Sequence, residues 1–247
     1  MKVLASYNIK GGVGKTATTV NLAHHAARQG ARTLIWDLDP QGAASFYFRV
    51  KPKVKGGFER FLHRKRDPVR AIRGTDYEGL DLIPADFSAR HMDLVFDRTR
   101  KPTRKLKRLV KRLGKEYDVL FLDCAPSIGV GSEVLFDVAD ALIVPTIPTT
   151  LSVNTLKQLK KYLKQRRGRG PEVLPFFSMV DDRKAMHRKI TKHPKDLAFT
   201  PLRARIPYSS TVEKMGVHRA PVCAFAAGSK PAKAYAKLGS EIEAHLN

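Results

Sequence analysis

Short apolar runs alternate along the chain with longer segments in which apolar residues recur every three or four positions. The apolar runs predict strands at residues 3–8, 33–38, 80–84, 118–123, 141–145, 173–179 and 202–206. The amphipathic segments predict helices, chiefly at residues 15–29, 58–64, 86–97, 103–114, 130–138, 152–166 and 230–246. Because the two kinds of segment alternate, we expect an α/β fold, a mainly parallel twisted sheet with helices on both faces. We expect residues 1–247 to form one domain.

Polar, glycine-containing segments predict two surface connections, at residues 49–57 and 166–171. No apolar stretch approaches the length of a membrane-spanning helix, and the chain begins with a predicted strand rather than a signal peptide. The two cysteines, Cys124 and Cys223, are too isolated for a disulfide framework or a paired metal site, and we expect Cys124 to be a packed core thiol. These observations predict a cytoplasmic protein.

A glycine-rich segment, Lys10–Thr16, reads Lys-Gly-Gly-Val-Gly-Lys-Thr and joins the first predicted strand to the first predicted helix. Such a turn lets backbone N–H groups surround a polyphosphate, and the helix N-terminus favours the same anion. Lys15 can reach the β- and γ-phosphates, and the Thr16 hydroxyl can ligate Mg²⁺. The ordinary phosphate-loop pattern has a glycine where this chain has Ile9. A second lysine, Lys10, stands at the head of the loop instead.

Carboxylates end two further predicted strands. Asp37 and Asp39 lie at the end of the run 33–38, and Asp123 ends the run 118–123. Parallel strands deliver their C-terminal residues to the ligand-binding edge of a sheet, so we expect these carboxylates near the phosphates and the metal. Asp123 is placed as expected of the acidic residue that holds Mg²⁺ through water in such NTPases. A capping or loop carboxylate is the alternative interpretation of either strand end alone.

With these three motifs the chain resembles the ParA/MinD class of deviant-Walker ATPases. It is most similar to ParA partition proteins without an N-terminal helix-turn-helix. The similar segments extend over nearly the whole chain, at residues 10–16, 37–42, 123–129, 142–145, 179–183, 206–207 and 228–235. The resemblance implies a P-loop NTPase fold with a deviant Walker A motif. It also implies ATP and Mg²⁺ as cofactors and a slow, partner-stimulated hydrolysis of ATP to ADP and phosphate.

The resemblance further implies roles for individual residues. Lys10 would cross to the partner subunit's ATP in a sandwich dimer, and Asp39 would orient the attacking water. The catalytic residues would be Lys10, Lys15 and Asp39, and the metal residues Thr16, Asp37 and Asp123. The nucleotide-binding residues would be Lys10, Gly11, Gly12, Val13, Gly14, Lys15, Thr16 and Ala17, with Met179 and Pro207 near the adenine.

The chain is strongly basic, with 46 Lys and Arg against 23 Asp and Glu and a formal net charge of +23. This excess predicts a polyanionic partner, with the DNA backbone first, although a solvated charged face is the alternative interpretation of any single basic helix. Basic groups lie at residues 98–115, 157–164 and 183–205. Binding should be phosphate-driven, sequence-blind and steeply salt-dependent. The residues that we expect to contact DNA are Arg183, Lys184, Arg188, Lys189, Arg203, Arg205 and Arg219.

These expectations combine into one function. We expect an ATPase that dimerises on ATP binding, binds DNA non-specifically and partitions or positions a cargo, such as a plasmid, a chromosome origin or a protein organelle. Hydrolysis would release the dimer from DNA. The expected partners are a second copy, DNA and a ParB-like or other cargo adaptor, with no membrane, and the expected location is the nucleoid in the cytoplasm.

Three alternative functions are weighed against it. A MinD-like membrane ATPase needs a C-terminal amphipathic helix, but residues 234–247 predict a helix docked on the core. An iron–sulfur carrier needs cluster cysteines, and neither Cys124 nor Cys223 has the expected setting. A DNA-binding scaffold with an inactive nucleotide site is disfavoured because all the expected site residues are present.

Overall fold

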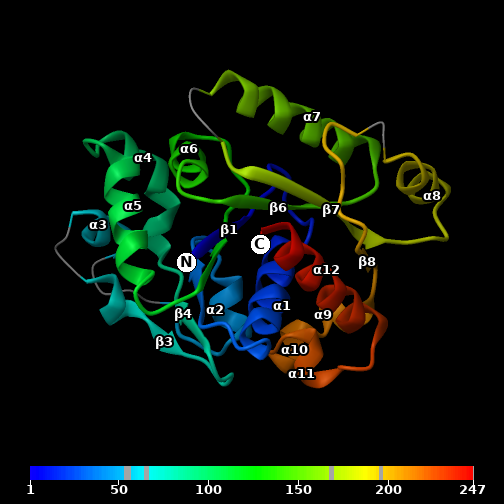
Figure 1. Ribbon diagram of the computed structural model, residues 1–247, viewed down its shortest axis with the longest axis horizontal. Coiled ribbons are helices and arrows are strands. Elements are labelled where there is room, and N and C mark those ends of the chain that lie inside the picture. The colour runs from blue at the N-terminus through cyan, green and yellow to red at the C-terminus, as the bar shows by residue number, and fades with distance from the viewer. Residues whose placement is uncertain (53–56, 64–66, 167–169, 195–196, 247) are drawn as a thin grey trace.

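The computed structural model describes residues 1–52, 57–63, 67–166, 170–194 and 197–246 (Figure 1). In this part of the chain, one eight-stranded sheet has the order β3-β4-β2-β5-β1-β6-β7-β8. Neighbouring strands pair in parallel except β3 and β4, which are antiparallel. The strands are β1 (Lys2–Ser6), β2 (Thr33–Asp37), β3 (Arg73–Gly74), β4 (Leu80–Ile83), β5 (Val119–Asp123), β6 (Ala141–Thr146), β7 (Glu172–Val180) and β8 (Arg205–Pro207). The predicted α/β fold with a mainly parallel sheet is confirmed.

Helices cover both faces of the sheet. Helices α3 to α7 lie on one side and α1, α2 and α9 to α12 on the other (Figure 1). The helices are α1 (Lys15–Arg28), α2 (Ala43–Tyr47), α3 (Gly57–Leu62), α4 (Met92–Asp97), α5 (Pro102–Leu113), α6 (Val130–Phe136), α7 (Thr150–Gln165), α8 (Ala185–Lys192), α9 (Ser210–Glu213), α10 (Met215–His218), α11 (Val222–Phe225) and α12 (Lys230–Leu246). The described residues also form the 3₁₀ helices η1 (Pro68–Ala71) and η2 (Phe87–His91).

The central strands are buried on both faces, and successive side chains enter different cores. Leu120 and Leu122 of β5 pack in one apolar cluster, whereas Phe121 between them packs in the other. Since every position of such a strand is apolar, the sequence shows a continuous run rather than alternation. Helix α1 ends where predicted, because Gly30 takes a left-handed conformation with φ +91°.

Two predicted elements differ in the structure. The helix expected at 86–97 is a 3₁₀ helix followed by α4, because the Asp86 side chain accepts the N–H of Ser88 and fixes a tight first turn. The strand expected at 202–206 is shorter, since Glu241 takes the N–H groups of Arg203 and Ala204 at 2.6 and 2.9 Å. Parts of the two predicted connections, residues 53–56 and 167–169, lie outside the described residues.

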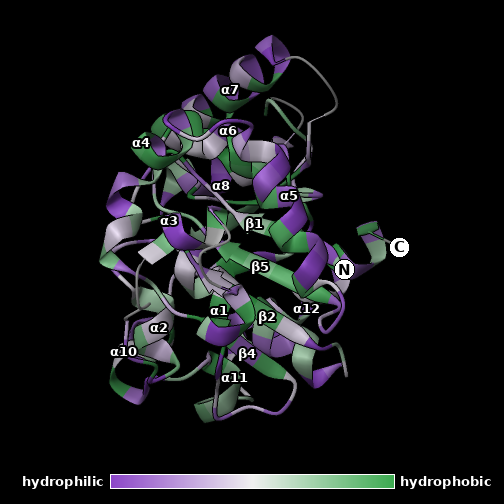
Figure 2. Cartoon of the chain, turned by 90° about the vertical axis from the view of Figure 1, so that its left-hand side faces the viewer, coloured by the Kyte–Doolittle hydropathy of each residue, from purple (hydrophilic) through white to green (hydrophobic). Residues whose placement is uncertain are grey.

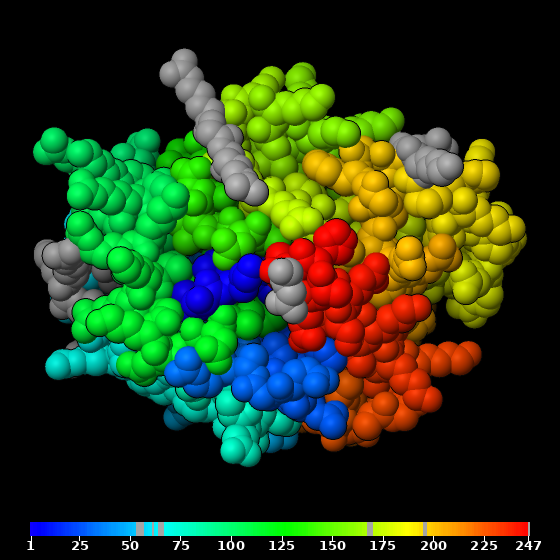
Figure 3. Space-filling view, in the orientation of Figure 1, coloured from blue at the N-terminus to red at the C-terminus, as the bar shows by residue number. Residues whose placement is uncertain are grey.

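The strands run from an edge that carries the two chain ends to the opposite edge beside α2 and α10 (Figure 2). The first and last described segments share one face of the molecule (Figure 3), where the Lys2 ammonium group donates to the carbonyl of Leu246 at 2.7 Å. Among the described helices, none combines the length and the apolar character needed to cross a bilayer.

Candidate active site

Three strand ends meet at the edge of the sheet opposite the chain ends. The C-terminal residues of β1, β5 and β2 are in register, with Ser6 paired to Asp123 and Asp123 paired to Asp37. The glycine-rich loop leaves β1 at this edge and leads into α1. The sheet therefore brings together the loop and the two carboxylate motifs, as the sequence predicts.

The loop is an open turn whose shape requires glycine at two positions. Gly12 and Gly14 have φ of +68° and +93°, a region that residues with a Cβ rarely adopt. A Cβ at Gly11 or Gly12 would meet no atom of the described residues within 4 Å, so space lies beside this backbone. A Cβ at Gly14 would lie 3.2 Å from the Ser178 hydroxyl and 3.7 Å from the Met179 methyl group. The loop thus borders both open space and the end of β7.

Asn8 holds the head of the loop, a role that the sequence motifs do not indicate. Its side-chain amide donates to the carbonyl of Pro145 at 2.8 Å, and its oxygen accepts the N–H of Lys10 at 2.9 Å. These two bonds tie the loop to the end of β6. A lone Asn after a strand carries no distinctive pattern, so the signal was absent from the sequence.

Lys15 points back across the loop from the first turn of α1. The residue is only 7% exposed, and its ammonium group donates to the carbonyl of Lys10 at 3.3 Å. Burial lowers the pKa of Lys15, and the charges of Asp123 and Asp39 oppose that shift. The two carboxylates keep the buried ammonium group charged, so Lys15 can act as a cation within the site.

Asp123 is fully buried and only partly satisfied. Its Oδ1 accepts the Thr19 hydroxyl at 3.1 Å. Within the described residues, its Oδ2 has no hydrogen-bond partner. Burial, followed by the charge of Asp37, raises the pKa of Asp123. An unpartnered buried oxygen at a ligand-binding edge is an acceptor available to a water or a cation.

Asp37 is better satisfied than Asp123. Its Oδ2 accepts both the backbone N–H and the hydroxyl of Ser45, at 2.9 and 2.7 Å, and its Oδ1 accepts the N–H of Asp39 at 3.3 Å. Burial still raises the pKa of Asp37. Asp39 is half-buried, and its Oδ1 accepts the N–H of Gln41 at 2.9 Å. Sequence reasoning missed Ser45, which lies eight residues beyond Asp37.

The remaining predicted nucleotide-binding residues lie on or beside the loop. Val13 is buried, whereas Lys10, Thr16 and Ala17 are half-buried. Lys10 forms no ion pair with any described residue. Its positive charge therefore remains available at the head of the loop.

Met179 and Pro207 lie at the ends of the next strands. Met179 has φ +53° and occupies an irregularity between β7 and β8, where Val180 pairs with Pro207. A non-glycine residue in this region costs energy and is typical of functional sites. Its methyl group approaches Gly14, as described above, so Met179 borders the loop from the β7 side.

Comparison with known proteins identifies the family. A family model described as an AAA domain matches residues 1–172. The virulence plasmid ParA family protein pGP5-D of Chlamydia psittaci is 30% identical over 190 residues, which cover 74% of this chain and 71% of that protein. The chain belongs to the ParA family of ATPases.

Two full-length similarities agree with membership in the ParA family. The sporulation initiation inhibitor protein Soj of Bacillus subtilis is 27% identical over 253 residues, covering 99% of each chain. A crystal structure described as cobyrinic acid a,c-diamide synthase from Mycobacterium smegmatis, with bound ADP and magnesium, has a TM-score of 0.83 and 27% identity. It covers 100% of this chain and 95% of that chain. The similarity therefore extends beyond the phosphate loop to the whole fold.

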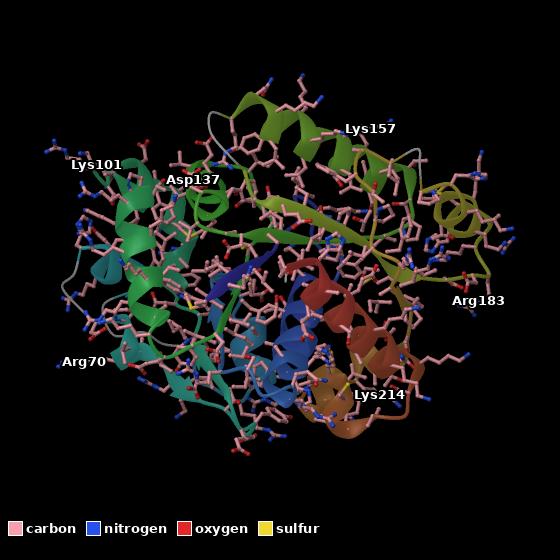
Figure 4. All side chains as sticks on the ribbon, in the orientation of Figure 1. Arg70, Lys101, Asp137, Lys157, Arg183 and Lys214 are labelled. Atoms are coloured by element: carbon pink, nitrogen blue, oxygen red, sulfur yellow. The ribbon has the colours of Figure 1, made fainter. Side chains whose placement is uncertain are left out.

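The expected DNA-contact residues of this ParA-family chain fall into two groups. Four lie on or just before α8, at the right of Figure 4, where Arg183 is labelled, namely Arg183, Lys184, Arg188 and Lys189. Arg205 on the neighbouring β8 donates to the carbonyl of Thr191 on α8 at 3.0 Å, and exposed Arg203 precedes it. Arg219 lies apart, stacked on Phe46 of α2 at 4.6 Å from the ring centre.

Several of these cations already have local partners. The Arg183 guanidinium donates to both oxygens of Asp181 at 2.9 and 3.0 Å, although its side chain is 85% exposed. Arg188 donates to the carbonyls of Asp182 and Arg183 at 2.6 and 2.9 Å. Lys184 and Lys189 are exposed. The α8 side of this ParA-family chain thus presents ordered cations to solvent.

The C-terminal helix and the two cysteines pack against other parts of the chain. Tyr235, Leu238 and Ile242 of α12 are buried against α1 and the sheet, as expected of a docked helix. Cys124 is a buried core thiol, as predicted, and burial raises its pKa. Cys223 is half-buried, and its thiol contacts the carbonyl of Ala232.

Proposed function

We propose that this chain is an ATPase that dimerises on binding ATP, binds DNA non-specifically and partitions or positions a cargo. One observation carries the proposal. Buried Lys15 and the carboxylates of Asp37, Asp39 and Asp123 converge at one sheet edge. Lys10, at the head of the loop, has no ion-pair partner among the described residues. Membership in the ParA family and the plasmid and chromosome proteins among its relatives support the cargo class.

The site fits a nucleotide with Mg²⁺. The open space beside Gly11 and Gly12 can take phosphates, and the free Oδ2 of Asp123 can accept a metal-bound water. The described residues hold no cluster of three or more His, Cys, Asp or Glu side chains able to bind a metal by themselves. We therefore assign Mg²⁺ to the Thr16 hydroxyl, with Asp37 and Asp123 acting through water. When bound, Mg²⁺ neutralises charge on the β- and γ-phosphate oxygens.

Each residue of the site has its own proposed role. Lys15 holds the β- and γ-phosphates, and Asp39 orients the attacking water. Lys10 crosses to the ATP of a second copy, where its charge offsets the charge that develops in the transition state. Loop backbone groups from Gly11 to Ala17 hold the phosphates, and Met179 and Pro207 border the adenine. A cation supplied across the interface makes dimerisation depend on the γ-phosphate, so hydrolysis releases the dimer.

The DNA, adaptor and location belong to the same proposal. The net charge of +23 and the exposed cations of α8 favour phosphate-driven binding to DNA. A protein of this kind lies on the nucleoid in the cytoplasm and meets its cargo through a ParB-like or other adaptor. We propose that residues 1–247 act as one domain.

The proposal is tested by ATP hydrolysis and by DNA co-sedimentation with and without ATP. Lys15→Ala should lower hydrolysis by about 10²-fold or more and abolish the ATP-dependent part of DNA binding. Lys2→Ala is the matched control, because Lys2 lies at the opposite edge of the sheet. If Lys15→Ala and Lys2→Ala both behave like the wild type, the proposed function is wrong.

A further inference from the structure

Helix α5 carries a row of cations that the DNA contacts proposed above do not include. No acidic residue occurs between Arg98 and Lys115. The exposed cations of α5 and its flanks are Arg98, Arg100, Lys101, Arg104, Lys107, Arg108, Lys111, Arg112 and Lys115. The row therefore extends along the whole solvent-facing side of the helix.

This charge pattern opposes the stability of α5. The first turn contains no acidic residue, the N-cap Lys101 is left-handed with φ +57°, and its side chain makes no cap hydrogen bond. Cations at a helix N-terminus are unfavourable. Like charges four residues apart, such as Arg104 with Arg108, repel each other. Helix stability thus accounts for Lys111 and Arg112 in the last turn but gives no reason for the cations nearer the N-terminus.

Helix α7 is also basic, but several of its polar and charged side chains contact other parts of the protein. Its N-cap Thr149 accepts the N–H of Ser152, and Lys164 lies in the last turn, where a cation is favourable. Lys160 donates to the carbonyl of Ala198 and lies 5.5 Å from the centre of the Phe199 ring. Lys111 and Arg112 in the last turn of α5 also agree with the helix dipole, but Lys101 and Arg104 at its N-terminal end do not.

Most cations on α5 have no acidic partner. Arg112 pairs with Asp67, but Arg104, Lys107, Arg108 and Lys111 form no ion pair with any described residue. They are free to meet an anion without first breaking an ion pair.

The apolar side of α5 is buried, so α5 cannot insert into a bilayer. Leu106, Leu109 and Leu113 are at most 6% exposed and belong to the core beneath the sheet. A helix that lies in a bilayer needs its apolar face free. Only a cationic, water-facing surface remains, and it suits a hydrated polyanion such as a DNA backbone.

We infer that α5 is a second DNA-backbone surface and that the molecule bridges two duplexes. Lys101, at the N-cap of α5, and Arg183, beside α8, lie on opposite sides of the molecule (Figure 4). The twelve residues of α5 extend about 18 Å, which matches about five base pairs of backbone. The inference rests on the proposed DNA binding, with the α8 side holding one duplex and α5 the other.

A bead assay with the full chain and ATP tests the inference. One duplex is fixed to beads, and capture of a second, labelled duplex is measured. The wild type should capture the second duplex. Arg104→Gln/Arg108→Gln/Lys111→Gln should reduce capture at least about tenfold while still binding the fixed duplex. Its melting temperature should equal or exceed that of the wild type, because like-charge repulsion is removed.

A variant of equal charge change is the control. Lys157→Gln/Lys161→Gln/Lys164→Gln on α7 should bridge like the wild type. The inference is overturned if the α5 variant bridges normally or the α7 variant loses bridging equally. It is also overturned if α5 is needed only for flotation with phosphatidylglycerol vesicles. A wild type that binds the fixed duplex but never captures a second one refutes bridging alone, whereas a wild type that binds no DNA refutes the proposed function as well.

Discussion

Asp37 of β2 and Asp123 of β5 are paired in register at the ends of adjacent strands, and both carboxyl groups are buried. Burial raises both pKa values; the charge of Asp37 raises that of Asp123 further, and the charge of Asp39 adds to the shift of Asp37. Ser45 donates two hydrogen bonds to Asp37, which partly offset the rise in its pKa. Asp123 retains an oxygen without a partner among the described residues. Negative charge is therefore unfavourable at this edge, and a bound Mg²⁺ ion would relieve it.

The first prediction concerns pH. A carboxyl group whose pKa is raised on folding favours its protonated form, so its contribution to stability is complete below about pH 4 and declines as the pH rises through the raised value. Asp123→Asn removes this decline. In nucleotide-free and metal-free buffer, the variant should be more stable than the wild type at pH 7.5, by on the order of 1 kcal/mol or more, and the gain should vanish near pH 4. Urea unfolding across this range measures the difference.

Asp118 supplies a control of opposite sign. It is exposed and paired with Arg32, and this contact lowers the pKa of Asp118 to about 2. Its contribution to stability is therefore present at neutral pH and lost as the pH falls. Asp118→Asn should show a small loss at pH 7.5 that disappears in acid. Equal pH profiles for Asp123→Asn and the wild type would contradict the first prediction.

The second prediction concerns the contact between α12 and α1. A Cβ on Gly239 would lie 2.2 Å from Cδ2 and 2.8 Å from Nε2 of His25. Since the His25 side chain is only 11% exposed, it has little room to move. Gly239→Ala should lower the free energy of unfolding by about 1–3 kcal/mol, as measured in urea.

A double-mutant cycle separates this clash from a general helix effect. Adding His25→Ala should remove most of the loss caused by Gly239→Ala, because the two residues are in contact. Gly216→Ala on α10 is the matched control, since a Cβ there meets no atom within 4 Å, and it should change stability by less than about 0.5 kcal/mol. Strict additivity of Gly239→Ala and His25→Ala would show that the clash is not the cause.

The third prediction concerns Asp39. The charge of Asp39 opposes the lowering of the pKa of Lys15. Asp39 is half-buried, whereas Asp37 is buried. Asp39→Ala should therefore preserve ATP binding, lower hydrolysis by about 10²-fold or more and let ATP-bound dimers accumulate. Size-exclusion chromatography with ATP measures the fraction of dimer, and phosphate release measures the rate of hydrolysis. Only monomers in the presence of ATP would contradict the assigned role.

The residues at the ligand-binding edge could be predicted from the sequence because the C-terminal ends of parallel strands all lie at the same edge of the sheet. The loop at 10–16 and the carboxylates Asp37 and Asp123 follow apolar runs, so their convergence required only the strand assignment. The spacing of apolar residues predicted the helix at 15–29, which the structure shows as α1, ending before Gly30.

Contacts between distant segments could not be predicted in this way. Ser45 supports Asp37 across a turn, Asn8 links the loop to β6, and Glu241 shortens the strand expected at 202–206 from 38 residues away. The positive φ of Met179 depends on the pairing of β7 with β8. None of these features has a local pattern, because each depends on a partner that only the folded chain brings close.

The central claim is that Lys10 completes the ATP site of a second copy, and sedimentation velocity tests it most directly. Wild-type protein and the surface control Lys214→Ala should form dimers with ATP and stay monomeric with ADP. Lys10→Ala should bind ATP but remain monomeric at the same concentration. If Lys10→Ala dimerises like the wild type, or if wild-type protein hydrolyses ATP normally while remaining monomeric, the account is contradicted.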